Sequence, residues 1–306
     1  MLQAFFFSER GFCATLPTQV TDQMKNQFES TKELTIATNA TVLTIAGSDP
    51  SGGAGLQADL KAFQQLGCYG MSVVTLLTVQ NTQGVHAIEV MPVDFVIAQL
   101  EKVVTDIPPR AIKTGALGNA DVICNLAAEL RNAPCPLVVD PVLVSKHGHS
   151  LGDEATVEAY RDELVPIANI LTPNRFEAEA LLQRKCESLQ DLANAAAALQ
   201  AQGPDLVLLK AGEVEGEHHH MIATGGGEVV GLSLESLDPK NSHGAGCMLS
   251  ALLAGYLTLH LEGQLDSGIL QDAVNFAVPV VHHGLQFAPD LGHGIGPVET
   301  RVISID

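Results

Sequence analysis

Short apolar segments alternate with segments of helical periodicity along most of this chain, beginning at Thr41. The first unit has an apolar strand at 42–46, a glycine-rich turn, and apolar residues at helical spacing between 56 and 66. Similar units follow to about residue 210, and a hairpin pattern and two final helices complete the chain. Such alternation predicts an α/β fold with a mostly parallel central sheet, helices on both faces and a late antiparallel hairpin.

The expected elements place several polar residues at the ends of strands. Strands are expected at 42–46, 72–79, 111–114, 137–140, 167–171, 206–210, 218–223 and 228–234, and helices at 95–104, 120–130, 177–182, 189–200, 247–261 and 267–285. Ligands bind at the carboxyl ends of strands in open parallel sheets. Residues 46–49, Asp140, 172–174 and Lys210 follow strands, so we expect these distant residues to converge.

Composition excludes several classes of partner. The chain has 306 residues, 46% of them hydrophobic, and a net charge of −19. This charge would repel the phosphates of nucleic acid or of an anionic membrane, so we expect neither as a partner. No apolar run approaches the roughly 18 residues of a membrane-spanning helix. The six cysteines are scattered without a Cys-X-X-Cys pair, which predicts a reducing, cytoplasmic location.

The first 40 residues differ from the rest. Phe5–Phe7 is too short for a secretory signal core, and the polar stretch from Thr18 to Asn39 has no clear periodicity. An organellar address and a translation start nearer Met24 are both compatible with this segment. We expect residues 1–40 to be a poorly ordered extension and residues 41–306 to form a single domain.

The turn Gly244-Ala-Gly-Cys247 directly precedes a long apolar helix. The first N–H groups of a helix lack partners within it and lie at the positive end of its dipole, so Gly244, Ala245 and Gly246 can form an anion hole for a phosphate. The same field favours the thiolate of Cys247, which could take a proton from an attacking alcohol. This interpretation indicates a kinase. An equally supported interpretation is a plain loop with a small buried cysteine.

Residues 47–55 contain four glycines between a strand and a helix. They match neither the phosphate-binding Gly-X4-Gly-Lys pattern nor the dinucleotide-binding Gly-X-Gly-X-X-Gly pattern. Asp49 can face a polar small substrate or can cap the helix that follows it.

Four further residues can handle phosphate or metal. Asn174 and Glu177 can hold Mg²⁺ and its waters against ATP phosphates, or can simply begin a helix. Asp140 ends an apolar strand and needs a partner or a metal there. Lys210 can balance charge on a transferring phosphoryl group.

His218–His220 resembles a metal-binding tract. Alternate residues of a strand face opposite sides, so at most two of these histidines can share one face. We therefore expect a solvated edge strand here.

Several of these segments occur together in one known family. The segments are 46–61, Val79–Gly84, 171–174, His243–Cys247 and 292–297. In this combination and order the chain resembles hydroxymethylpyrimidine/phosphomethylpyrimidine kinase, the thiamine-pathway member of the ribokinase-like superfamily. The resemblance covers about residues 41–300 and implies a three-layer ribokinase-like fold.

The resemblance implies two ATP-dependent phosphorylations. The first converts 4-amino-5-hydroxymethyl-2-methylpyrimidine to its monophosphate, and the second gives the diphosphate. Cys247 would serve as the base in the first step, whereas the second step needs only the anion hole. The resemblance also implies Mg²⁺ and a homodimer. It assigns pyrimidine contacts to Gly47, Ala54, Gln80 and Val142, and phosphate or metal contacts to Asp140, Asn174, Glu177 and Lys210.

Two positions depart from the family pattern, and they keep rival functions open. Ala245 replaces the usual Thr of the anion-hole turn but keeps the backbone amides. Ala116 replaces a larger Met that lines the substrate pocket, which favours a pyridoxal kinase, whereas Gln80 favours the pyrimidine. A non-catalytic pyrimidine-binding sensor would have no use for the phosphate-handling groups. A dinucleotide oxidoreductase is disfavoured by the missing glycine fingerprint.

Overall fold

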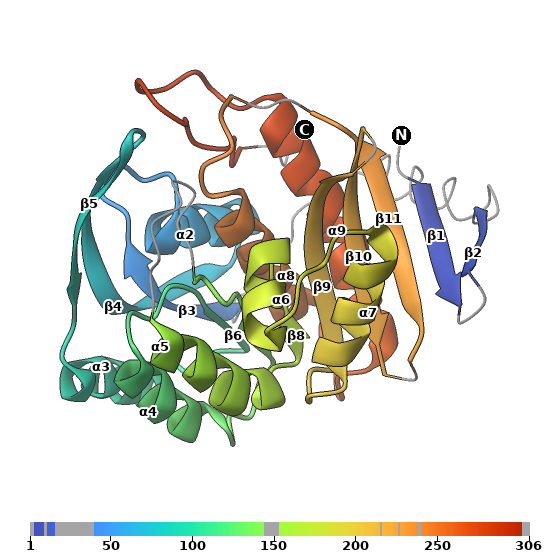
Figure 1. Cartoon of the computed structure of the whole chain (residues 1–306). Coiled ribbons are helices and arrows are strands. Elements are labelled where there is room, and N and C mark those ends of the chain that lie inside the picture. The colour runs from blue at the N-terminus through green and yellow to red at the C-terminus, as the bar shows by residue number, and fades with distance from the viewer. Residues whose placement is uncertain are drawn as a thin grey trace.

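The computed structural model describes residues 3–8, 11–15, 40–143, 153–214, 216–225, 227–237 and 240–301. The described strands form one sheet flanked by helices (Figure 1). In spatial order they are β2 (Gly11–Thr15), β1 (Gln3–Ser8), β11 (Val229–Glu235), β10 (Glu217–Thr224), β9 (Leu206–Val214), β8 (Ile170–Leu171), β7 (Leu137–Val139), β6 (Ala111–Thr114), β3 (Thr41–Ser48), β4 (Tyr69–Asn81) and β5 (Gly84–Val90).

The middle of the sheet is parallel and its ends are antiparallel. Strands β4, β3, β6, β7, β8 and β9 run in one direction. The hairpin of β10 and β11 follows β9, and β5 pairs with β4, both in antiparallel fashion. The predicted fold class is confirmed, although the sequence analysis did not anticipate β5.

Strands β1 and β2 extend the sheet beyond the predicted hairpin. The backbone of β1 pairs with β11 in antiparallel register, and β2 pairs with β1 (Figure 1). These two strands were not predicted from the sequence. The expected poor order of residues 1–40 stays a prediction, and residues 1–2, 9–10 and 16–39 of this segment lie outside the described residues.

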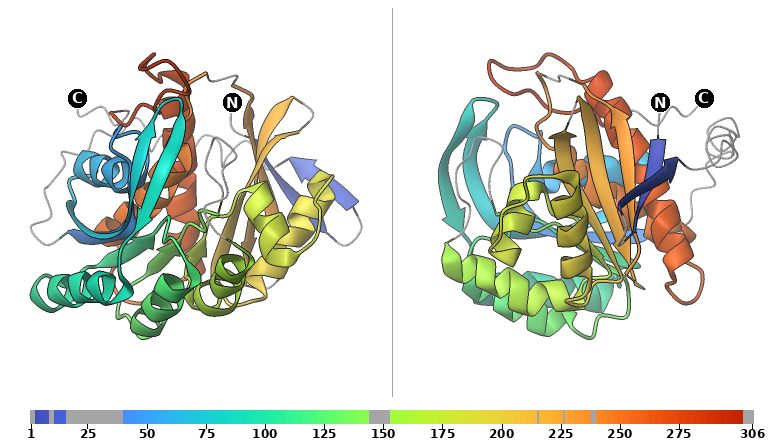
Figure 2. Two further views of the ribbon diagram at one scale, coloured as in Figure 1. Left: turned by 60° about the vertical axis from the view of Figure 1, so that its left-hand side comes forward. Right: turned by 45° about the vertical axis from the view of Figure 1, so that its right-hand side comes forward.

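Helices cover both faces of the sheet, as two further views show (Figure 2). The described α-helices are α2 (Gly55–Gln65), α3 (Val93–Asp106), α4 (Ala120–Leu130), α5 (Glu154–Ala159), α6 (Arg175–Leu182), α7 (Leu189–Gln200), α8 (Ala245–His260) and α9 (Ser267–Gln286). A π-helical turn (Tyr160–Leu164) and a 3₁₀ turn (Val165–Ile167) continue α5. Helices α3 to α7 contribute to one apolar core, whereas α2, α8 and α9 contribute to the other. The molecule thus has three layers, with a core on each side of the sheet.

The burial pattern explains why β3 and α8 are so apolar. Leu43 and Ile45 of β3 enter one core and Val42 enters the other, because successive side chains of a strand point to opposite faces. A strand buried on both sides therefore reads as a continuous apolar run. Helix α8 lies beside both α2 and α9, and every residue from Met248 to Gly255 is buried. The position of this buried helix fixes the turn that precedes it.

The histidine tract lies in the interior of the sheet. Strand β10 lies between β9 and β11, and the side chains of His219 and His220 are only 4% and 7% exposed. His219 Nε2 lies 3.1 Å from the carbonyl oxygen of Val214. The expectation of a solvated edge strand was therefore wrong, because β11 and β1 continue the sheet beyond β10.

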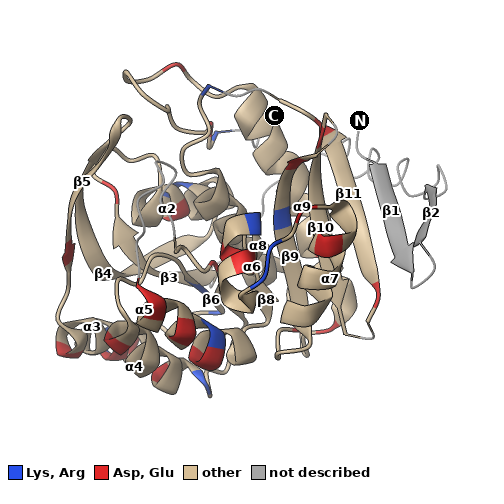
Figure 3. Ribbon diagram, in the orientation of Figure 1, with Lys and Arg blue, Asp and Glu red and all other residues tan. Residues whose placement is uncertain are grey.

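Acidic residues are distributed over several surface elements, notably α3, α4 and α5 (Figure 3). No helix among the described residues is long and apolar enough to cross a membrane.

Candidate active site

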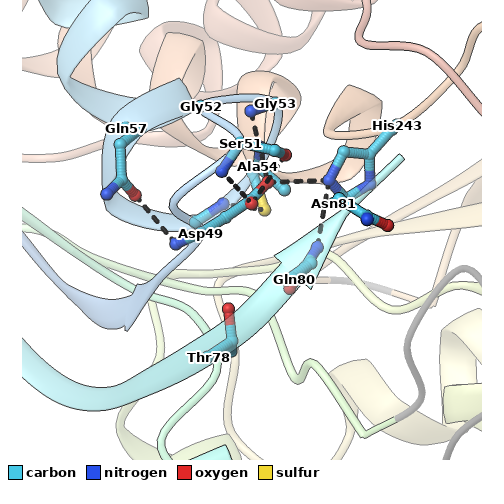
Figure 4. A network of polar contacts seen from close by, with 12 residues as sticks. Asp49, Ser51, Gly52, Gly53, Ala54, Gln57, Thr78, Gln80, Asn81 and His243 are labelled. Atoms are coloured by element: carbon cyan, nitrogen blue, oxygen red, sulfur yellow. Dashed lines mark hydrogen bonds and ion pairs between the residues drawn. The ribbon is translucent and has the colours of Figure 1, made fainter. Parts of the chain in front are cut away.

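Two loops meet beside the carboxyl end of β3. One follows β3 and begins with Asp49, and the other contains His243 and leads into α8. The carboxylate of Asp49 and the imidazole of His243 face each other across this junction (Figure 4). The parallel sheet thus gathers loop residues at one edge, as its topology requires.

Asp49 organises the loop that follows β3. Its Oδ1 accepts hydrogen bonds from the backbone N–H and the hydroxyl of Ser51, at 2.9 and 2.7 Å. Its Oδ2 accepts from the N–H groups of Gly53 and Ala54, at 3.2 and 2.8 Å. Burial alone would raise the pKa of Asp49, but hydrogen bonds from His243 and Ser51 outweigh it and lower the pKa to about 2. Asp49 is therefore an ionised anchor for this loop.

His243 joins that anchor to β4. Its Nε2 lies 2.8 Å from Asp49 Oδ2 and 3.1 Å from the side-chain nitrogen of Gln80 (Figure 4). His243 is only 5% exposed, and its backbone is held by hydrogen bonds to Gly296 and Val298. The expected substrate residue Gln80 thus contacts the residue that directly precedes Gly244.

The Gly244-Ala-Gly-Cys247 turn packs tightly on the first loop. Gly244 has φ of 84°, and a Cβ atom there would overlap the carbonyl oxygen of Gly53. The first i→i−4 bond of α8 runs from Met248 N to Gly244 O at 2.8 Å, so the N–H groups of Gly246 and Cys247 precede it. This is the geometry of an anion-binding helix N-terminus.

Cys247 lies in the first turn of α8, beside the start of α2. Its Sγ accepts a hydrogen bond from Gly55 N at 3.4 Å. Burial, reinforced by Asp59 and Asp140 and opposed by Lys113, raises the pKa of Cys247 to about 11. The helix N-terminus was expected to favour a thiolate, whereas desolvation dominates in the structure and favours the thiol.

Lys210, which is partly exposed, forms an ion pair with the buried Asp140 beside the turn. The Lys210 ammonium lies 3.0 Å from Asp140 Oδ1, which also accepts from the Thr172 hydroxyl. Burial would lower the pKa of Lys210, but Asp140 and Glu177 raise it, so Lys210 is cationic. A Cβ atom on Gly246 would lie 3.4 Å from the Lys210 ammonium. The cation therefore lies directly beside the proposed anion hole. Strand β9 continues past Lys210 to Val214, so this lysine lies within the strand rather than at its end.

Asn174 and Glu177 form the start of α6. The Asn174 side chain accepts from Glu177 N at 2.9 Å, and Glu177 Oε2 accepts from Asn174 N at 2.7 Å. This is a capping box, the structural alternative considered from the sequence. Burial, opposed by Lys210 and reinforced by Asp140, raises the pKa of Glu177 to about 7.

The remaining expected substrate residues lie around the same edge. Gly47 is the penultimate residue of β3, and Ala54 immediately precedes α2. The carbonyl of Ala116 accepts from the Thr75 hydroxyl at 2.6 Å. Val142 is half-buried and follows β7 by three residues. The structure therefore brings Gly47, Ala54 and Gln80 toward the Asp49 loop, whereas Ala116 and Val142 have no hydrogen bond to it among the described residues.

Sequence reasoning missed three buried polar residues here. His243 was noticed only as part of a motif, and Lys113 and Asp59 were not considered. The Lys113 ammonium lies 2.7 Å from Asp59 Oδ2, and both side chains are fully buried. The sequence does contain a signal for this buried pair. Lys113 interrupts an apolar strand. Asp59 falls between Leu56 and Phe63 on the apolar face of α2.

Comparison with known proteins shows to which class of protein this site belongs. A family model described as phosphomethylpyrimidine kinase matches residues 49–299. The hydroxymethylpyrimidine/phosphomethylpyrimidine kinase of Streptomyces coelicolor is 40% identical over 258 residues, which cover 84% of this chain and 93% of that protein. The fold and the site therefore define an α/β small-molecule kinase. The chain belongs to the phosphomethylpyrimidine kinase family.

Solved structures of two kinases share the fold. The phosphomethylpyrimidine kinase of Clostridium difficile is 36% identical with a TM-score of 0.66, over 79% of this chain and 99% of that one. The pyridoxal kinase of Staphylococcus aureus in complex with ADP is 32% identical with a TM-score of 0.77, over 86% of this chain and 93% of that one. The fold is thus ribokinase-like, as the family resemblance implied.

Proposed function

We propose that this kinase phosphorylates 4-amino-5-hydroxymethyl-2-methylpyrimidine to its monophosphate and then to its diphosphate, with ATP as donor, for thiamine biosynthesis. One observation carries the proposal. Gln80, whose amide suits an aminopyrimidine edge, contacts His243 at 3.1 Å, and His243 is followed directly by the Gly244–Cys247 turn. A ring held by Gln80 would therefore present its substituent beside the anion hole.

In the first phosphorylation the substrate hydroxyl attacks the γ-phosphorus of ATP. The bond from phosphorus to the bridging oxygen of ADP breaks, and the hydroxyl proton passes to the sulfur of Cys247. Because the pKa of that thiol is about 11, the thiolate is scarce at neutral pH but strongly basic when it forms. The N–H groups of Gly246 and Cys247, with the Lys210 ammonium, would stabilise the charge that develops on the transferred group.

In the second phosphorylation the nucleophile is already an anionic phosphate, so this step needs no base. Gly244, Ala245 and Gly246 would hold the phosphate through backbone amides. Ala245 lacks the hydroxyl of the usual threonine, but it keeps its backbone amide. The two steps therefore differ in their dependence on Cys247.

The residues present fit a hydrated Mg²⁺. Within the described part of the chain, no three His, Cys, Asp or Glu side chains gather to hold a metal ion. Asp140 and Glu177 offer carboxylate oxygens close enough to Lys210 to raise its pKa, and Mg²⁺ commonly takes few protein ligands with waters and phosphates. The ion would neutralise phosphate charge, and Asp140 and Glu177 are the residues that would orient its waters. Asn174 would act at the same phosphate end of the site.

The proposal includes a cytoplasmic homodimer. Tyr69, Leu77 and Val79 of β4 are 63%, 47% and 62% exposed, and Ile88 and Phe95 add to the exposed apolar residues of this region. Exposed apolar groups of this kind favour association. Light scattering of the purified protein would test the dimer.

A pyridoxal kinase is the second candidate. The pyridoxal kinase of Staphylococcus aureus superposes with the higher TM-score of the two kinases compared, and a side chain as small as that of Ala116 would favour a bulkier ring. The test is steady-state ATP turnover with the hydroxymethylpyrimidine, its monophosphate or pyridoxal, with products identified by mass. Diphosphate from the pyrimidine series would support the proposal. Turnover of pyridoxal alone would assign the second candidate, and no turnover with any of the three would favour a sensor.

A further inference from the structure

The contact between His243 and Gln80 determines which end of the Gln80 amide faces the substrate. Asp49, Gln80 and His243 come from three separate segments and meet at one imidazole nitrogen (Figure 4). That nitrogen, His243 Nε2, lies 2.8 Å from Asp49 and 3.1 Å from Gln80. One nitrogen cannot donate to and accept from two partners at once, so its protonation decides both contacts.

The surroundings of Asp49 fix that protonation. Among the described residues, every other group that hydrogen-bonds to its carboxylate is a donor, namely the N–H groups of Ser51, Gly53 and Ala54 and the Ser51 hydroxyl. These donors hold Asp49 as a carboxylate, and its pKa of about 2 agrees. A ring nitrogen 2.8 Å from a carboxylate oxygen must carry a hydrogen. His243 Nε2 is therefore a donor.

A donor at Nε2 requires an acceptor on Gln80. Figure 4 draws the amide nitrogen of Gln80 toward the ring, which would place two N–H donors 3.1 Å apart. A half-turn of the amide exchanges its oxygen and nitrogen in nearly the same space. The Gln80 oxygen then shares the single hydrogen of His243 Nε2 with Asp49 Oδ2, in a bifurcated hydrogen bond, and the NH₂ group is available to another partner.

We propose that His243, anchored by Asp49, is a positioning residue that turns the Gln80 amide so that its NH₂ group donates to a ring nitrogen of the substrate. This rests on the proposed function, because it assumes that Gln80 meets a pyrimidine. The site then selects for a hydrogen-bond acceptor in the ring. Backbone bonds to Gly296 and Val298 hold His243 in place independently of its side chain.

The test is a thermodynamic cycle that combines removal of the His243 imidazole with replacement of one ring nitrogen of the ligand. Binding of the hydroxymethylpyrimidine and of its two pyridine analogues, each with one ring nitrogen replaced by C–H, is measured by calorimetry for wild type and His243→Leu. In the wild type, one analogue should bind about tenfold more weakly than the pyrimidine, as expected for one lost hydrogen bond. His243→Leu should weaken pyrimidine binding by a similar factor and leave binding of that analogue unchanged. KM should rise for the pyrimidine while kcat changes little.

The matched variant is His243→Gln, whose amide can still donate to Asp49 and to the Gln80 oxygen. It should recover most of the affinity, and thermal unfolding confirms that each variant is folded. Equal losses for the pyrimidine and both analogues in His243→Leu would overturn the positioning role and leave the proposed function intact. Failure of the wild type to bind the pyrimidine would overturn both.

Discussion

The Lys113 ammonium lies 2.7 Å from Asp59 Oδ2, and neither side chain is exposed to solvent. Asp59 Oδ2 also accepts from the Thr44 hydroxyl at 2.6 Å, whereas Asp59 Oδ1 has no hydrogen-bond partner among the described residues. The pair thus joins α2 to β6 beneath the site. A buried pair of this kind depends on both partners, because either charge alone would be uncompensated.

We predict that Lys113→Met destabilises the protein by about 3–5 kcal/mol, because Asp59 would be left buried without its cation. The double variant Lys113→Met with Asp59→Leu should recover most of that loss, since it removes both charges. Chemical denaturation of both variants and of wild type measures the free energy of unfolding. A double variant no more stable than Lys113→Met would show that the lost ion pair is not the cause.

We predict that Cys247→Ala slows the first phosphorylation by about 100-fold or more and the second far less, because only an alcohol must lose a proton. Steady-state rates with the pyrimidine and with its monophosphate measure the two steps separately. The monophosphate reaction is the internal control for folding and ATP binding. Equal losses in both steps would exclude Cys247 as the base.

The pKa of Cys247 also predicts a pH profile. Burial raises this pKa to about 11. At any pH below that value, the thiolate fraction increases about tenfold for each unit by which the pH rises. The kcat/KM for the first phosphorylation should therefore rise from pH 7 to pH 9, whereas the second should not follow this trend. A flat profile for the first step would indicate that thiolate formation does not limit it.

The sequence predicted the layers of this fold because each strand and helix carries its own periodicity. It also predicted that Asp49, Asp140 and Lys210 would lie at one edge, since parallel strands end together. Pairing beyond the hairpin could not be foreseen. Strand β1 covers the edge of β11, and a strand's neighbours are long-range contacts that periodicity does not encode.

The chemistry of the site was harder to predict than its position. The motif suggested a thiolate at Cys247, but the degree of burial that raises its pKa depends on α2, α8 and the sheet together. The contact of His243 with Asp49 joins residues 194 positions apart. Asn174 and Glu177 form a capping box, which the sequence could present only as one of two alternatives.

The lowered pKa of Asp49 predicts that the free energy of unfolding decreases at low pH. Its folded-state pKa of about 2 lies below the ordinary value of about 3.9 for an aspartate, so its ionised form stabilises the fold. This contribution is complete above about pH 4 and is lost as the pH falls through about 2. Urea unfolding between pH 5 and pH 2 should show the advantage of wild type over Asp49→Asn shrinking toward zero. An advantage that stays constant over this range would contradict the assignment.

Two alanine substitutions in one turn should move stability in opposite directions. Gly244→Ala places a side chain at φ of 84° and against the carbonyl oxygen of Gly53, so it should cost about 1–3 kcal/mol from the backbone alone and most of the kinase activity. Gly246→Ala lies in the first turn of α8, where its Cβ would meet only the Lys210 ammonium and the Asp140 carboxylate, at 3.4 and 3.8 Å. It should keep or raise the unfolding temperature, because alanine favours a helix over glycine. Thermal unfolding of the two variants measures this contrast, and a stable, active Gly244→Ala would show that the turn does not need its left-handed glycine.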